Sequence, residues 1–297
     1  MRAPLVPKSM KTASKIFTAS LGALFFLNYG SGALRAADAP ATDAAPASTA
    51  PAVQETLHPA LFLVGDSITK TGTPPGDRGP WGMGYEVIPL FDSSKIHVYN
   101  EGAGGRSSRS YYYEQGQWDR VLTRMQPGDF VIMMFGHNDA ANSDNYPTRT
   151  TITGSGDETL QVGFRDTLQT VHTYGWYLRQ YVNEAKAKGV TVIVCSPVPR
   201  NQWANGKIKR GFDGYAQWAA DAAKASGAPF LDLNTISANK YEALGQDATR
   251  AYFADQQHPT KAGAKLNAQS VVEGLKQLKD VPLAKYLLPD ASPAPAK

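Results

Sequence analysis

The sequence predicts an α/β fold, a doubly wound parallel sheet with helices on both faces, from two observations. Short apolar runs typical of buried strands recur at Leu61–Val64, Ile96–Tyr99, Phe130–Phe135, Val190–Val194 and Phe230–Leu233. Longer segments with helix formers and apolar positions three or four residues apart lie between and after them, at Val162–Lys188, Tyr215–Ala225 and Lys261–Leu278. Because the two patterns alternate, we expect a parallel sheet.

Residues 1–36 have the pattern of a secretory signal peptide. Basic residues come first, then the apolar stretch Ile16–Tyr29, then small residues. Ser20 and Asn28 interrupt this stretch, which is shorter than the roughly 20 apolar residues of a membrane-spanning helix. We therefore expect cleavage at a site among Ala36 to Ala39, no stable membrane anchor, and an exported protein that is periplasmic or secreted.

Two further segments, residues 37–57 and 289–297, are rich in alanine and proline and show no periodic apolar pattern. Such a composition cannot bury enough apolar surface to offset the entropy lost on ordering. We expect a disordered linker at 37–57, one catalytic domain over 58–288, and a flexible tail at 289–297.

The net charge argues against one class of function. The chain has 30 basic and 26 acidic residues, a formal charge of +4. Five of the basic residues and none of the acidic ones lie in residues 1–36, so cleavage would leave 25 basic and 26 acidic residues, a charge of −1. A nearly neutral surface is not that of a general nucleic-acid binder. The sequence carries no indication of an oligomeric state.

Metal, redox and nucleotide chemistry lack their usual residues. The single cysteine, Cys195, lies in an apolar run and has no partner for an intrachain disulfide, so we expect an inert core residue. The sequence contains no H-E-x-x-H motif, no cysteine pair and no P-loop.

Ser67 is a candidate nucleophile because it directly follows the first predicted strand, in the sequence Gly65-Asp66-Ser67. Ligands of parallel α/β sheets bind at the carboxyl ends of the strands, and we expect Ser67 at the start of a helix there. A serine in that position also serves as a simple N-cap. The segment lacks the second glycine of the G-x-S-x-G elbow, so the usual α/β-hydrolase signature is absent.

A serine hydroxyl needs a base and an orienting acid to become a nucleophile. Asp255 and His258 supply both. Two residues separate them in a loop before the last predicted helix, which Pro259 and Thr260 would start. His137 is the alternative base. We expect structural or surface roles for the other histidines. His58 lies near the linker, His97 in a predicted strand and His172 on a predicted helix.

Two segments after strands could stabilise the oxyanion of an acyl-transfer reaction. The glycine-rich segment Asn100–Ser107, which contains Gly105, would let a backbone NH approach the substrate. In the segment Gly136–Asp139, the side-chain amide of Asn138 could donate a hydrogen bond. Each segment is equally consistent with an ordinary polar turn.

Together these residues resemble the blocks of the SGNH hydrolase superfamily, which match Gly65–Ser67, Gly105, Gly136–Asp139 and Asp255–His258. Longer segments resemble its rhamnogalacturonan acetylesterase branch, at Gly79–Gly82, Asn100–Tyr111, Phe135–Asp139 and Tyr252–Gly263. The resemblance implies a flavodoxin-like three-layer α/β/α sandwich with a five-stranded parallel sheet, and hydrolysis without a metal or an organic cofactor.

The resemblance also implies the role of each residue. Ser67 attacks the ester carbonyl, His258 takes and returns the proton, and Asp255 orients the imidazole. The NH groups of Ser67 and Gly105 and the amide of Asn138 hold the oxyanion.

The implied substrate is an acetylated polysaccharide or oligosaccharide, above all the acidic rhamnogalacturonan backbone of pectin. Basic side chains that could meet its carboxylates are Arg106, Arg109, Arg149, Lys207, Lys209 and Arg210. Aromatic side chains that could stack on sugars are Trp81, Tyr111, Tyr112, Trp118 and Trp203.

Three alternatives stay open at this point. The chain could be an SGNH esterase of other specificity, such as a xylan or glucomannan acetylesterase or a lysophospholipase. It could be a non-catalytic carbohydrate-binding protein that has kept the fold. It could also serve an interaction role at the cell surface, with Ser67 purely structural.

Overall fold

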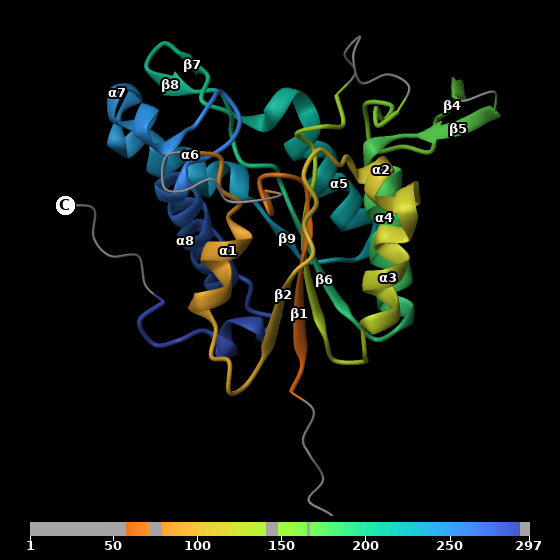
Figure 1. Cartoon of the computed structure of the whole chain (residues 1–297), viewed down its shortest axis with the longest axis horizontal. Helices are drawn as coiled ribbons and strands as arrows, with labels where there is room; N and C mark the ends of the chain where they lie inside the picture. Colours follow the sequence, from red (N-terminus) through yellow and green to blue (C-terminus); the bar gives the residue numbers. More distant parts are fainter. Residues whose placement is uncertain (1–57, 72–78, 141–147, 165–166, 292–297) are drawn as a thin grey trace, which may run out of the picture. The chain divides into compact units, whose positions relative to one another are not determined.

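The computed structural model describes residues 58–71, 79–140, 148–164 and 167–291 (Figure 1). The predicted signal peptide and linker and residues 292–297 of the predicted tail lie outside these ranges. The first tail residues lie inside them: Ala291 is buried, and the Lys276 ammonium donates to its carbonyl oxygen at 3.4 Å. The packed domain therefore extends at least to Ala291. Among the described residues, no helix is both long and apolar enough to cross a bilayer.

Five parallel strands form the central sheet, in the order β2-β1-β3-β6-β9. They are β1 (Ala60–Gly65), β2 (His97–Asn100), β3 (Phe130–Met134), β6 (Thr191–Cys195) and β9 (Phe230–Leu231). Each strand coincides with one of the five apolar runs to within two residues at either end. The predicted strands and the parallel sheet are confirmed.

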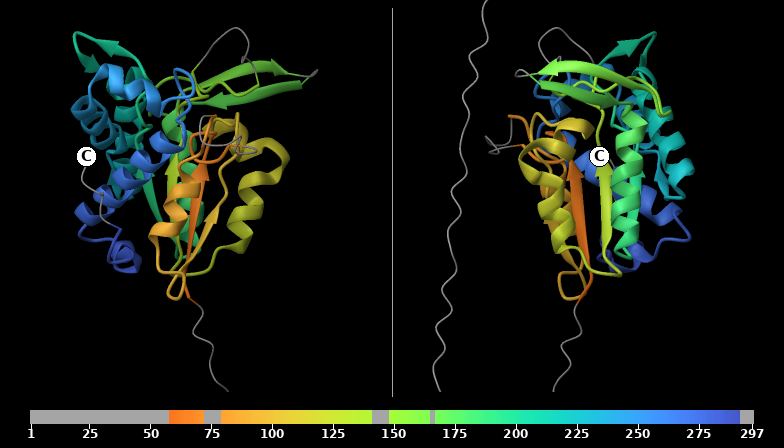
Figure 2. Two further views of the ribbon diagram at one scale, coloured as in Figure 1. Left: turned by 60° about the vertical axis from the view of Figure 1, so that its left-hand side comes forward. Right: turned by 90° about the vertical axis from the view of Figure 1, so that its right-hand side faces the viewer.

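Helices cover both faces of this sheet, which makes three layers (Figures 1 and 2). Successive side chains of a strand point to opposite faces, so Phe62 and Leu63 of β1 belong to two separate core clusters. The Phe62 cluster includes residues of α2 (Ser108–Tyr113), α3 (Gln117–Arg124), α4 (Tyr174–Ala187) and α5 (Tyr215–Ser226). The Leu63 cluster includes residues of α1 (Gly84–Val87), α6 (Leu233–Leu244) and α8 (Lys261–Gln277). The predicted three-layer sandwich is confirmed.

Short elements connect these layers. They are α7 (Gln246–Thr249) and the 3-10 segments Ile88–Leu90, Glu114–Gly116, Gly211–Gly214, Arg250–Tyr252 and Pro282–Tyr286. A two-stranded hairpin joins β7 (Trp203–Ala204) to β8 (Lys207–Ile208). Its turn residues Asn205 and Gly206 both have positive φ, as a tight hairpin turn requires.

The predicted helix over Val162–Lys188 is wrong in its first half. An antiparallel hairpin of β4 (Thr159–Phe164) and β5 (Thr167–His172) occupies that region, and α4 begins only at Tyr174. In this hairpin Val171 is buried while its neighbour Thr170 is exposed, the period of two that belongs to a strand. The Thr173 hydroxyl then caps α4 by accepting from the Trp176 NH at 3.0 Å. His172 therefore lies on a strand and not on a helix.

The strand order places a topological switch point between β1 and β3. The chain passes from β1 to β2 on one side and then returns to add β3 on the other side of β1. The crevice at the carboxyl ends of two such strands is where doubly wound sheets bind ligands. The loops after these two strands carry Ser67 and Asn138.

Cys195, at the end of β6, is fully buried in the core. Burial raises the pKa of its thiol to about 12. The thiol is therefore protonated at neutral pH, as expected for an inert core residue.

Candidate active site

Ser67 lies in a tight turn at the carboxyl end of β1. The Asp66 carbonyl accepts hydrogen bonds from the NH groups of Thr69 and Lys70, both at 3.0 Å. Ser67 thus begins a turn, and the expectation that it begins a helix is wrong. A Cβ at Gly65 would lie 2.4 Å from the carbonyl oxygen of Met134 on β3. Glycine at this position therefore lets the turn pack directly against the neighbouring strand.

His258 and Asp255 lie beside Ser67, in the loop that precedes α8. His258 Nε2 is 2.9 Å from Ser67 Oγ, and His258 Nδ1 is 2.8 Å from Asp255 Oδ2. Because a carboxylate only accepts hydrogen bonds, Nδ1 carries a proton and Nε2 presents its lone pair to the Ser67 hydroxyl. This arrangement allows a histidine to take the proton of a serine.

The same loop holds the Asp255 carboxylate in place. Its Oδ1 accepts from the NH groups of Gln257 at 2.7 Å and of His258 at 2.6 Å. Partial burial acts to raise the pKa of Asp255, but these backbone hydrogen bonds and the contact with the His258 ring outweigh it and lower the pKa. The carboxylate is therefore charged at neutral pH, and the 53% exposure of its side chain to water also favours the charged form.

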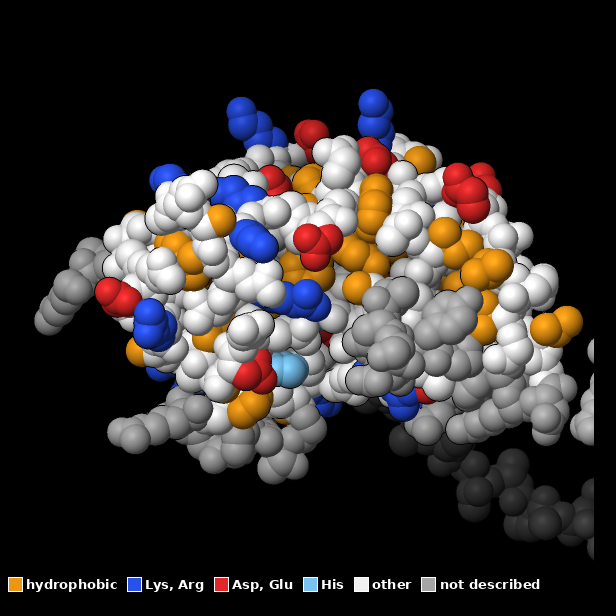
Figure 3. Space-filling model, turned by 90° about the horizontal axis from the view of Figure 1, so that it is seen from above, with side chains coloured by type: hydrophobic (Ala, Val, Ile, Leu, Met, Phe, Trp, Pro, Cys, Tyr) orange, Lys and Arg blue, Asp and Glu red, His pale blue; other side chains and the backbone are white. Residues whose placement is uncertain are grey.

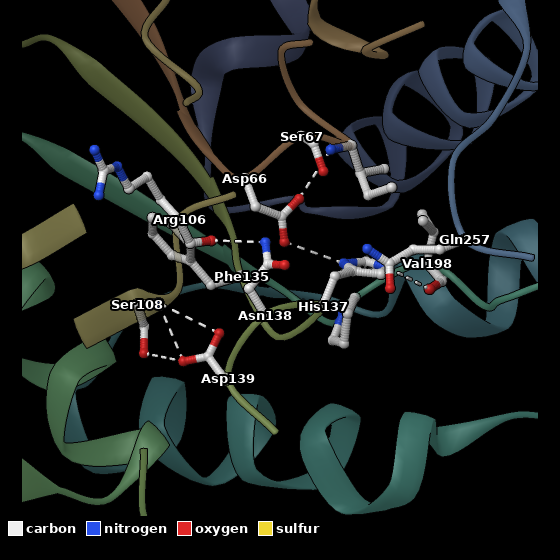
Figure 4. A network of polar contacts seen from close by, with 12 residues as sticks. Asp66, Ser67, Arg106, Ser108, Phe135, His137, Asn138, Asp139, Val198 and Gln257 are labelled. Carbon is white, nitrogen blue, oxygen red and sulfur yellow. Dashed lines mark hydrogen bonds and ion pairs between the residues drawn. The ribbon is translucent and has the colours of Figure 1, made fainter. Parts of the chain in front are cut away.

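Asp66 and His137 form a fully buried pair between the loops after β1 and β3 (Figure 4). His137 Nδ1 is 3.2 Å from Asp66 Oδ2, and His137 Nε2 is 3.1 Å from the carbonyl oxygen of Val198. Both ring nitrogens of His137 thus face an oxygen atom inside the protein. His137 is thereby committed to structure and does not act as the base for Ser67.

Arg200 links this pair to the loop of His258. Its NH2 group donates to the carbonyl oxygen of His137 at 3.2 Å, and its Nε donates to the Gln257 side chain at 3.2 Å. The guanidinium also lies 4.5 Å from the ring centre of Phe212. Burial lowers the pKa of Arg200, while the charges of nearby Asp213 and Asp66 act in the opposite direction. Sequence reasoning missed Arg200, although it follows the fourth strand at the same sheet edge.

The expected oxyanion donors come from two neighbouring loops. Gly105 has a φ of +74°, a left-handed conformation that favours glycine. A Cβ on the preceding Gly104 would lie 3.9 Å from Ser67 Cβ, so this loop runs past the nucleophile. The Asn138 amide nitrogen donates to the Arg106 carbonyl oxygen at 3.0 Å (Figure 4). An NH2 group has a second hydrogen to donate.

Asp139 is a buried carboxyl group that braces the loop of Asn138. It accepts hydrogen bonds from the backbone NH of Ser108 at 3.1 Å and from the Ser108 hydroxyl (Figure 4). Burial raises the pKa of Asp139 to about 7, and the charge of Asp66 adds to this rise, while the hydrogen bonds from Ser108 oppose it. Asp139 therefore titrates in the neutral range.

The basic residues expected at an acidic substrate lie in different environments. Arg149 donates to the Gly105 carbonyl oxygen at 2.7 Å, against the glycine loop. Arg109 is buried on α2, not in a loop, and donates to the Thr150 carbonyl oxygen at 3.0 Å. The structure thus places the Arg149 guanidinium against the loop of Gly105.

Other members of that basic set are engaged by acids. Arg106 forms an ion pair with Glu114. Arg210 and Lys207 both pair with Glu242, at 2.8 and 3.3 Å. Seen from the carboxyl ends of the strands, basic, acidic and hydrophobic side chains are interspersed over the surface (Figure 3).

The expected aromatic residues divide into core and surface. Tyr111 and Trp118 are each 1% exposed, so the expectation that they stack on sugars is wrong. Trp81 is partly exposed, and its backbone NH donates to the Pro259 carbonyl oxygen beside His258. Trp203 is partly exposed on β7. Among the residues described here, no group of three or more His, Cys, Asp or Glu side chains could hold a metal ion.

A serine, a histidine and an aspartate in a hydrogen-bonded row, at the switch point of a doubly wound sheet, are features of serine hydrolases. The chain belongs to the GDSL-like Lipase/Acylhydrolase family, whose model matches residues 63–266. This membership confirms the resemblance to SGNH hydrolases and makes the protein a carboxylic-ester hydrolase.

Two relatives are named for the same activity. The chain is 30% identical over 220 residues to the rhamnogalacturonan acetylesterase of Emericella nidulans, a match that covers 74% of this chain and 85% of that protein. It is 29% identical over 234 residues to the probable rhamnogalacturonan acetylesterase YesY of Bacillus subtilis, which covers 77% of this chain and 97% of that protein.

Solved structures share the fold. YxiM of Bacillus subtilis superposes with a TM-score of 0.60 at 21% identity over 74% of this chain, which spans only 56% of the YxiM structure. The acetylxylan esterase Axe2 of Geobacillus stearothermophilus superposes with a TM-score of 0.52 at 22% identity, over 73% of this chain and 94% of Axe2.

The contacts of Arg200 predict a positioning role. Arg200→Ala removes both hydrogen bonds that tie the His258 loop to His137, so we expect kcat for an acetate ester to fall roughly 10- to 100-fold with a smaller change in KM. Arg200→Lys should give an intermediate kcat. The surface variant Arg250→Ala, whose side chain is 70% exposed, is the control. An Arg200→Ala enzyme with unchanged kcat would contradict this role.

The raised pKa of Asp139 predicts a pH-dependent stability. Because the unfolded carboxyl releases its proton near its model value of 3.8 and the folded one only near 7, the free energy of unfolding should decrease as pH rises from 4 to about 7. The decrease is at most roughly 4 kcal/mol.

Asp139→Asn keeps a neutral side chain at every pH, so it should lack this decrease. Urea unfolding at several pH values compares this variant with the wild type and with the surface control Asp119→Asn. Parallel pH curves for the wild type and Asp139→Asn would show that Asp139 does not titrate in this range.

Proposed function

We propose that the protein is an exported serine esterase that removes acetyl groups from a plant cell-wall polysaccharide, with the rhamnogalacturonan backbone of pectin as its substrate. The observation that carries this proposal is the row of hydrogen bonds from Ser67 through His258 to Asp255. The row lies at the switch point between β1 and β3, where doubly wound sheets bind their ligands.

In the proposed mechanism, His258 Nε2 takes the Ser67 proton while Ser67 Oγ attacks the acetyl carbonyl carbon. Asp255 stabilises the imidazolium that forms. The NH groups of Ser67 and Gly105 and the second amide hydrogen of Asn138 donate to the oxyanion. His258 then gives its proton to the sugar oxygen as the ester bond breaks, which leaves an acetylated Ser67. Water activated by His258 releases acetate and restores the serine.

The polysaccharide substrate is proposed from the relatives and from the site together. Both curated relatives described above are named rhamnogalacturonan acetylesterases, and they align with this chain over most of their lengths. Their polymer carries galacturonate carboxylates, and Arg149 provides a guanidinium against the Gly105 loop. An esterase for long acyl chains would need an extended apolar groove instead.

Export is proposed from residues 1–36 alone, whose pattern is that of a signal peptide. A cell-wall polymer is too large to enter a cell, so export would bring the enzyme to the intact polymer.

Acetate release by the purified protein tests this function. We expect fast release from acetylated rhamnogalacturonan and slower release from acetylated xylan. Ser67→Ala should lower kcat by roughly 10⁴- to 10⁶-fold, because the nucleophile is gone. Ser94→Ala, at an exposed serine before β2, is the matched control and should retain full activity.

Each alternative has its own outcome. Release from xylan alone, or from long-chain esters alone, would leave the Ser67 mechanism standing and reject the pectin substrate. Full activity of Ser67→Ala on every ester would reject the mechanism itself.

A further inference from the structure

A cavity of about 400 Å³ lies between α2 and the β4–β5 hairpin, outside the row of Ser67, His258 and Asp255. Its lining includes Arg109, Tyr113, Glu114, Thr148, Gln169 and Thr170. The volume is within the range of sites that bind small organic ligands. No step of the proposed mechanism uses these side chains.

The glycine loop links the candidate active site to the cavity lining. Gly104 approaches Ser67. Arg106 of the same loop pairs with Glu114 of the lining. Arg149, which follows the lining residue Thr148, donates to Gly105. A linear molecule bound at Ser67 would have to pass this loop to reach the cavity.

Tyr113 presents a fixed aromatic surface there. Its ring meets Tyr112 at 4.9 Å and 89°, and Tyr177 at 6.0 Å and 88°, so two perpendicular contacts hold its orientation. Even so, Tyr113 is 55% exposed. An exposed ring with an apolar face and a polar tip suits the C–H face of a sugar.

The polar lining suits sugar hydroxyl groups, which both donate and accept hydrogen bonds. Arg109 donates to Gln169 Oε1 at 2.7 Å, which fixes the orientation of the amide and leaves its NH2 group to donate elsewhere. The Glu114 carboxylate, which pairs with Arg106, can accept further hydrogen bonds, and the Thr148 hydroxyl can both donate and accept. Such a mixed lining does not suit an acyl chain.

We propose that this cavity is a subsite for a sugar unit of the polysaccharide other than the one whose acetyl group reaches Ser67, with Tyr113 as its stacking surface. The proposal rests on the proposed function, since it requires a polysaccharide substrate. It implies that an oligosaccharide gains affinity once it is long enough to extend past Gly105 and reach Tyr113.

Calorimetric binding tests this subsite in full-length Ser67→Ala protein, which does not consume the ligand. Acetylated rhamnogalacturonan oligosaccharides are compared from disaccharide to octasaccharide. We expect Kd to fall roughly three- to tenfold at a particular length. Tyr113→Ala in the same background should abolish that fall, and Tyr113→Phe, which keeps the ring, should retain it.

Leu168→Ala is the matched control for the hairpin. Leu168 precedes Gln169 on β5, so its side chain points to the opposite face, and it is 75% exposed. It should show the same length dependence as the parent protein. A Kd that does not change with length, or a fall that persists in Tyr113→Ala, would overturn the subsite. Acetate release by the wild type judges the proposed function separately.

Discussion

The contact between Asp66 and His137 joins the ends of β1 and β3, and the other parts of the site are placed relative to it. Asp66 precedes Ser67, while His137 precedes Asn138 and holds Arg200 through its backbone carbonyl. Leaving either buried group without its partner would cost several kcal/mol, so the two loops are strongly constrained to stay together. One buried pair thus connects the nucleophile, the amide donor and the His258 loop.

The fold explains why residues so distant in sequence meet. Ser67 and His258 are 191 positions apart, yet both lie at the carboxyl edge of the sheet. The β1 strand delivers Ser67 there, and α8, which packs on one face of the same sheet, begins immediately after His258 and Pro259. Gly65 and Gly105 let backbone segments approach where a side chain or an ordinary φ would keep them apart.

Much of this architecture was predictable from the sequence because its signals are local. Continuous apolar runs identified all five strands of the sheet, and the positions of Ser67, Asn138 and His258 after strands or before a helix identified the site region. The β4–β5 hairpin was mistaken for helix because few of its apolar side chains are buried. Leu160 and Leu168 are exposed, and only Val162 and Val171 of its described side chains are buried.

Tertiary contacts account for the rest. Arg200 acts through the backbone carbonyl of His137, an acceptor that every residue type possesses, so no sequence pattern reveals it. Similarly, Tyr111 and Tyr113 are two positions apart in one aromatic run, and only helix packing decides that the first is core and the second is surface. The raised pKa of Asp139 depends on burial, which the sequence does not display.

The loop of Asp255 and His258 closes on itself, through a bridge between Phe253 and Pro259 and a 2.8 Å hydrogen bond from Ala254 to His258. Its internal geometry is therefore local, whereas its distance from Ser67 depends on how α8 and Arg200 attach it to the sheet. Local openings of a protein cost less free energy than global unfolding. A partial detachment of the C-terminal segment would move His258 away from Ser67 and abolish catalytic activity while the sheet stays folded. Heat inactivation would then report the anchoring of one helix, at a lower temperature than the melting of the domain.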